Sequence, residues 1–220
     1  MSLADWQQRQ LAVEAADSAQ GLTDAVEALA ELTDPRSTAT LIQVLGFNNP
    51  GAAVAAVDGL VAIGVSAVGP LLDKLDGYNY GARAWAIRAL AGIGDPRGQP
   101  LLLEAAASDF AMSVRRAAAR GLGSLRWTDV PVGQRYGYWH RSLVQLLSVV
   151  EDEEWVVRYA AVVGLALLGA VESDEIADIP PTDRLTICQT LENRMQQDTS
   201  AVVQARAQWA LQTLDSGASA

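Results

Sequence analysis

Apolar residues recur along most of this chain at the spacing of one face of an α-helix, and no useful stretch alternates as a strand would. Leu3, Trp6, Leu11 and Ala15 form the apolar face of the first segment. Gly, Asp and Pro residues mark the breaks between helices. A helix is predicted from a cap at Thr23 or Asp24 to Asp34-Pro35, and a short one from Gly69-Pro70 to Gly77. The other predicted helices cover residues 3–20, 37–46, 51–63, 81–93, 97–107, 112–125, 140–150, 154–169, 182–197 and 200–214.

One pattern repeats through the chain: a small residue, an arginine, an alanine-rich turn and a leucine. Arg83, Arg115 and Arg158 are the arginines of three copies, while Gln204 and Ala53 take the same place in two more. The leucines of the first two arginine copies lie 32 residues apart, which is typical of a helix-pair repeat.

A second marker keeps the same period. Asp-Pro-Arg segments end at Arg36 and Arg97, 61 residues apart, and proline suits the first turn of a helix but not its interior. Each segment therefore predicts a turn between helices. We expect an all-α, right-handed α-solenoid of HEAT-like helix-pair repeats, forming one domain over 1–214 with a disordered tail at 215–220.

Charge and composition exclude several kinds of function. The net charge of −10 argues against general binding to nucleic acid, although residues 81–141 hold nine arginines and only four acids. No apolar run is long enough to insert into a membrane and no signal peptide begins the chain, so we expect a cytoplasmic protein. The sequence has one cysteine, Cys188, and one histidine, His140, which are too few for a Cys-cluster or multi-histidine metal site. Their spacing does not support a Cys–His nucleophile pair either, and we expect the Cys188 thiol to be buried.

Two predicted loops are rich in aromatic residues. The first is DGYNYG, residues 76–81, and the second is RWTDVPVGQRYGYWHR, residues 126–141. Aromatic side chains in a polar loop are not needed for a helical core, which favours a binding role. The alternative is that they fill gaps where successive repeats are spaced irregularly.

The repeat arginines also allow two interpretations. Equivalent positions of stacked repeats line up, so Arg83, Arg115 and Arg158 would form a ladder of guanidinium groups that suits carboxylates of a ligand or partner. The structural alternative is that each arginine binds helix-end carbonyls or the aspartate of a neighbouring turn.

The run YNYGARAWAIRALAGIGDPR, followed by SDFAMSVRRAAARGLGSL, closely resembles the HEAT-like repeat proteins of the E/F class of phycobilin lyases, and in particular their F subunits. The resemblance implies a heterodimer with an E-type subunit. It also implies covalent attachment of phycocyanobilin or a related bilin, as substrate and not as a permanent cofactor, to a cysteine of a phycobiliprotein alpha subunit. The nucleophilic thiol then belongs to the acceptor.

The resemblance also implies roles for individual residues, because a bilin carries two propionates and four pyrrolic nitrogens on an apolar body. Asp109 is the expected catalytic residue, which would hold protonated pyrrole nitrogens. The expected bilin-binding residues are Arg83, Arg115, Arg158, Tyr78, Tyr80, Trp85, Trp127, Tyr138 and Trp139. The Asn-His-Cys-Pro motif of isomerising F subunits is absent, so attachment without isomerisation is expected. The competing hypothesis is a HEAT-like scaffold or chaperone without enzymatic activity.

Overall fold

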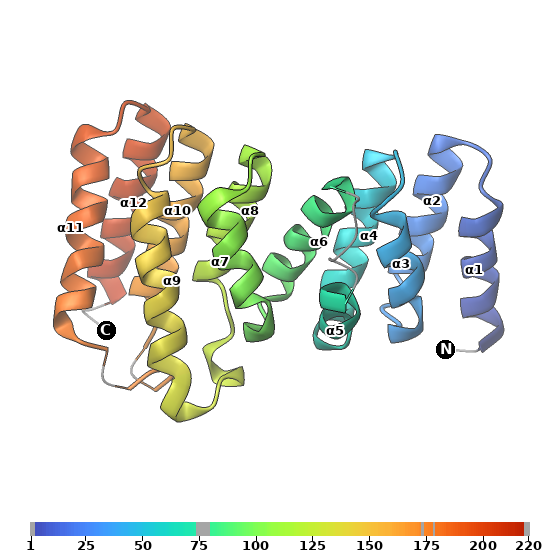
Figure 1. The fold of residues 1–220 in the computed structure, drawn as a ribbon, viewed down its shortest axis with the longest axis horizontal. Coiled ribbons are helices and arrows are strands. Elements are labelled where there is room, and N and C mark those ends of the chain that lie inside the picture. The colour runs from blue at the N-terminus through green and yellow to red at the C-terminus, as the bar shows by residue number, and fades with distance from the viewer. Residues whose placement is uncertain (1–2, 74–79, 173, 178, 218–220) are drawn as a thin grey trace. The chain divides into compact units, whose positions relative to one another are not determined.

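The computed structural model describes residues 3–73, 80–172, 174–177 and 179–217, and within them it contains α-helices and short 3-10 turns but no strand (Figure 1). The first α-helices are α1 (Leu3–Ala15), α2 (Ala19–Ala30), α3 (Thr38–Val44), α4 (Pro50–Ile63), α5 (Val65–Asp73) and α6 (Tyr80–Ile93). The later ones are α7 (Gln99–Ser108), α8 (Met112–Gly123), α9 (Arg135–Val149), α10 (Trp155–Gly169), α11 (Pro181–Gln197) and α12 (Ala201–Gly217). The all-α repeat fold is confirmed.

The chain falls into two compact units, residues 1–93 and 94–220. In the first unit α2 packs on α4 and α4 on α6, and in the second α8 packs on α10 and α10 on α12. The second helix of each pair therefore stacks on its counterpart in the next pair, as expected for helix-pair repeats. One continuous solenoid and its right-handed sense stay predictions.

The Asp-Pro-Arg segments form the predicted turns. In each, the aspartate caps a short 3-10 helix, η1 (Pro35–Ser37) or η2 (Pro96–Gly98), by accepting the arginine's backbone N–H. Asp34 and Asp95 also bind the guanidinium two residues later through two oxygens. Each segment thus holds its own turn closed.

Two predicted helix starts in the first unit are wrong. Ser18, not Thr23 or Asp24, caps α2, because the first helix ends at Ala15 and the Ser18 hydroxyl accepts the Gly21 N–H at 3.1 Å. Pro70 lies inside α5 and does not open it.

The early start of α5 follows from the glycine before it. Gly64 has a φ of 74°, a left-handed conformation that glycine adopts without a Cβ penalty, and it ends α4 so that α5 begins at the next residue.

The second aromatic loop is also shorter than predicted, since α9 starts at Arg135 and not at residue 140. Arg135 anchors this start by donating from Nε to the Val130 carbonyl at 2.9 Å and from Nη1 to the Glu175 carbonyl at 2.8 Å. At the other end of the chain α12 continues to Gly217, into the segment expected as a disordered tail, and 218–220 lie outside the described residues.

Helices α8 and α10 approach each other closely at two glycines. A Cβ on Gly123 would lie 2.5 Å from the Cα and carbonyl oxygen of Gly164, which no side chain tolerates. Leu122, Leu146 and Leu165 are fully buried around this crossing. The second unit therefore has a tightly packed interior that fixes how α8 and α10 present their other faces.

Candidate functional site

Arg115 on α8 is held in the interior of the second unit. It donates from Nε and Nη2 to the carboxylate of Asp152, at 2.7 and 3.0 Å. Its Nη1 donates to the carbonyls of Asp109 and Phe110 in the preceding turn, at 2.9 and 3.2 Å. The Arg115 and Asp152 side chains are only 11% and 12% exposed. Arg115 thus fastens its own helix start to the next repeat.

Arg158 repeats these contacts one repeat later. It donates from Nε and Nη2 to Asp198, at 2.8 and 2.9 Å, and from Nη1 to the carbonyls of Asp152 and Glu153, at 2.9 and 3.0 Å. Burial raises the pKa of Asp198, but the hydrogen bonds from Arg158 and from the Ser200 backbone N–H, together with the charges of Arg158 and Arg194, outweigh this effect, so the pKa lies below its ordinary value. We call these two linked pairs, Arg115–Asp152 and Arg158–Asp198, the arginine–aspartate ladder.

The ladder also fixes the register between repeats. Gln204 on α12 donates to the carbonyl of Asp198 at 2.7 Å, six residues back, as Arg115 and Arg158 do to Asp109 and Asp152. These three positions are therefore equivalent. The structural alternative holds for Arg115 and Arg158, because their guanidinium groups are engaged by turn aspartates and helix-end carbonyls.

The residue that follows each ladder position lies on a different face of its helix, since successive residues of a helix lie about 100° apart around its axis. Arg116 follows Arg115 and is exposed, as is Arg120 one turn further on. In the part of the chain that the structure describes, neither makes an ion pair or a side-chain hydrogen bond. Their charges are thus available to an anionic ligand.

Aromatic residues occupy the same face on α10 and α12. By the register, Tyr159 is equivalent to Arg116, and Trp209 is equivalent to Arg120. Trp155, one turn before Tyr159, is 45% exposed and Trp209 is 57% exposed. We call this surface the arginine–aromatic face, and its members are Met112, Arg116, Arg120, Trp155, Tyr159 and Trp209.

A hollow of about 570 Å³ lies on this face between α10 and α12. Tyr159, Val202, Arg206 and Trp209 line it, together with small alanine side chains. The guanidinium of Arg206 lies 4.2 Å from the centre of the Trp209 ring. The hollow therefore offers a cation beside aromatic and apolar walls, which suits a ligand that has carboxylates on an apolar body.

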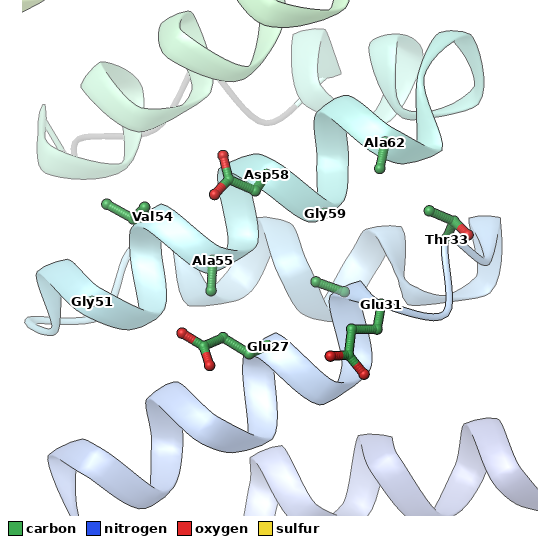
Figure 2. A pocket seen from close by; sticks show the side chains of 10 residues that line it. Glu27, Glu31, Thr33, Gly51, Val54, Ala55, Asp58, Gly59 and Ala62 are labelled. Carbon is green, nitrogen blue, oxygen red and sulfur yellow. The ribbon is translucent and has the colours of Figure 1, made fainter.

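The first unit has a hollow of opposite character. It measures about 410 Å³ between α2 and α4, with small residues such as Ala55 and Gly59 in its wall. Figure 2 shows Glu27 on α2, Glu31 at the C-terminal cap of α2 and Asp58 on α4 along it. Among the described residues, no basic one lines this acidic groove. Like charges repel, so it disfavours a ligand that carries carboxylates.

Three of the predicted aromatic residues lie in the second unit, and two of them belong to its core. Trp139 is fully buried and donates its indole N–H to the Leu168 carbonyl at 3.2 Å, and Trp127 is 3% exposed. Tyr138 is half-buried, with the Arg141 guanidinium 4.4 Å from its ring centre. Trp127 and Trp139 fill the interior, as the alternative for this loop expected.

The remaining predicted residues are placed as follows. Asp109 lies half-buried in the turn before α8 and accepts the Ala111 N–H at 3.0 Å. Arg83 and Trp85 lie half-buried on α6 of the first unit. Tyr78 lies outside the described residues, and only the backbone of Tyr80 is described.

The structure also locates the side chains considered for nucleophilic or metal chemistry. Burial is the main cause of a raised pKa at the Cys188 thiol, which disfavours the reactive thiolate. Among the described residues no cluster of three His, Cys, Asp or Glu side chains is placed to hold a metal ion.

Sequence reasoning missed Arg116, Arg120, Trp155, Tyr159, Arg206 and Trp209. The net positive charge of residues 81–141 was the available signal for the first two. The ladder contacts establish how the repeats align, and only this alignment shows that Arg115 faces inward while Arg116 faces outward.

Stacked helix pairs with an exposed arginine–aromatic face define a HEAT-type repeat protein with a surface suited to an anionic, apolar ligand. Family models agree with the fold: "HEAT repeats" match residues 68–135 and "PBS lyase HEAT-like repeat" matches residues 23–47. No described helix combines the length and the apolar composition needed to span a lipid bilayer.

Known proteins narrow the class. The chain is 49% identical to the phycocyanin alpha phycocyanobilin lyase CpcF of Synechocystis sp. strain PCC 6803, over 92% of this chain and 91% of that protein. It is 48% identical to a phycobilisome maturation protein of Synechococcus elongatus, over 94% and 96%.

A solved structure, the complex of CpcE and CpcF of phycocyanin lyase from Nostoc sp. PCC7120, matches with a TM-score of 0.71 and 44% identity, covering 80% of this chain and 99% of that one. The chain belongs to the CpcF-type family of HEAT-like phycobilin lyase subunits.

Proposed function

We propose that this chain is the F-type subunit of a heterodimeric lyase that attaches phycocyanobilin to a cysteine of the phycocyanin alpha subunit. CpcF-type relatives of similar length support this proposal. The E-type partner is inferred from the solved complex of CpcE and CpcF, because this chain aligns with 99% of the matching chain in that complex.

The proposed reaction needs little chemistry from the lyase itself. The acceptor's thiol adds across the exocyclic double bond of the bilin, so that sulfur bonds to the outer carbon and a proton goes to the ring carbon, and nothing leaves. The acceptor supplies the nucleophile. The lyase contributes by holding the bilin in one geometry and by excluding addition to the wrong face.

The arginine–aromatic face is the observation that carries the proposal. Arg116 and Arg120 present two guanidinium groups one helical turn apart, and no acid of the described chain competes for them. Trp155, Tyr159 and Trp209 provide flat surfaces for the pyrrole rings on the neighbouring helices. The face therefore matches the propionates and the conjugated body of a bilin.

The ladder has a supporting role in this proposal. Arg115 and Arg158 lock α8 and α10 to the turns that lead into α10 and α12, so the exposed residues beside them keep a fixed spacing. Asp109, in the turn that leads into the face, stays the proposed group for holding the pyrrole N–H groups. Asp109→Asn tests this role, since an amide cannot balance a cationic bilin.

The scaffold alternative predicts a flat apolar groove and no arginine-lined hollow. The hollow of the second unit, with Arg206 and Trp209, favours the lyase. Attachment without isomerisation follows from the missing Asn-His-Cys-Pro motif and stays part of the proposal.

Reconstitution tests the proposed function. The chain is expressed with an E-type subunit, a phycocyanin alpha subunit and a phycocyanobilin pathway, and each component is omitted in turn. We expect zinc-enhanced bilin fluorescence on the acceptor in a denaturing gel only when all are present. Equal labelling without this chain, or an uncoloured acceptor across a panel of bilins, would instead favour the scaffold.

A further inference from the structure

Arg206 is half-buried, and it differs from the ladder arginines Arg115 and Arg158 because no carboxylate of the described chain is bound to it. Its Nη1 atom is buried and has no hydrogen-bond partner. Burial lowers the pKa of this guanidinium, and the Tyr159 side chain offsets only part of that effect. An unsatisfied buried donor is costly, so its presence calls for a function.

The repeat itself does not require an arginine here. The ladder register makes Ala117 on α8 and Ala160 on α10 equivalent to Arg206, and both are small. Arg206 therefore adds a cation at a place where the fold packs with a methyl group. It does so at the wall of the hollow that it shares with Trp209.

We propose that Arg206 binds one propionate of the bilin, with the Trp209 ring against the adjoining apolar body. The inference rests on the proposed lyase function and adds a binding residue to it. A carboxylate in the hollow supplies the counter-charge that no described residue provides to Arg206, and a planar guanidinium can hold both of its oxygens. The partly dehydrated surroundings strengthen this contact compared with one in open water.

Arg206→Met tests this assignment, because it removes the charge and keeps an unbranched apolar stem. Non-covalent binding of phycocyanobilin to the chain with its E-type partner, without acceptor, is followed by absorbance titration. Each protein is titrated with the free-acid bilin and with its dimethyl ester. Gln208→Met, an exposed substitution on the same helix, is the matched control.

We expect Arg206→Met to weaken binding of the free acid about tenfold or more, while binding of the ester stays as in the wild type. Arg206→Lys should recover part of the loss, and Gln208→Met should bind both forms normally. Circular dichroism checks that the variants are folded.

Equal binding of the free acid by wild type and Arg206→Met would overturn the assignment while the lyase function stands. An equal loss for acid and ester would also overturn it, since such a loss reflects shape and not charge. If the wild-type complex binds no bilin and labels no acceptor, the proposed function fails first and the assignment fails with it.

Discussion

Replacing Arg158 with alanine separates a structural role from a ligand-binding one. The side chains of Arg158 and Asp198 are 10% and 0% exposed, and their closest contact is 2.8 Å. At an effective dielectric constant of about 20, opposite charges at this distance attract by about 6 kcal/mol before the cost of removing them from water. Arg158→Ala leaves the Asp198 carboxylate buried without this partner and leaves two carbonyls without a donor.

We therefore expect Arg158→Ala to destabilise the second unit by about 3–5 kcal/mol. This is a large fraction of the roughly 5–15 kcal/mol that holds a typical domain together. Urea unfolding, followed by circular dichroism and by the fluorescence of the buried Trp127 and Trp139, should show a midpoint lower by about 1 M or more.

Arg116→Ala is the matched control, because its exposed side chain makes no described ion pair although it follows a ladder arginine. Its stability should stay within about 0.5 kcal/mol of the wild type. A loss below about 1 kcal/mol for Arg158→Ala would refute the reasoning, and so would an equal loss for both variants.

Two further predictions concern stability. Burial raises the pKa of Asp198, but the hydrogen bonds from Arg158 and Ser200 and the charges of Arg158 and Arg194 together hold it below 3.8. The pair therefore stabilises the fold above that pH and loses the stabilisation as pH falls through the lowered pKa. The urea concentration at the unfolding midpoint should decrease as the pH is lowered below about 4, and this decrease should be less steep in Asp198→Asn. A pH profile in that variant identical to the wild type's would contradict this prediction. Gly123→Ala should cost about 1–3 kcal/mol in a thermal melt, because its Cβ meets the backbone of Gly164, whereas Gly133→Ala, with open space around it, should melt normally.

The repeat architecture could be predicted because its signals are local. The Asp-Pro-Arg turns around Asp34 and Asp95 use contacts within three residues, so their sequence determines their form. The start of α9 could not be predicted, because Arg135 is held by the Glu175 carbonyl, 40 residues away.

The site was harder to predict for a similar reason. The sequence marks Arg115 and Arg158 by their periodicity, but only the distant partners Asp152 and Asp198 show that these guanidinium groups are engaged. Periodic residues build the stack, and the residues that we propose to face the ligand, such as Arg116, need not repeat. The burial of Trp127 and Trp139 could not be predicted, because burial of a tryptophan depends on tertiary packing.

The rate of bilin transfer in paired charge variants tests the central claim most directly. Arg116→Ala/Arg120→Ala changes the arginine–aromatic face, and Glu27→Gln/Asp58→Asn changes the acidic groove. Both alter exposed charges, and both should leave the fold intact. We expect the first variant to label the acceptor about tenfold more slowly or worse, and the second to match the wild type. Normal labelling by the arginine variant, or a comparable loss in the groove variant, would contradict the account.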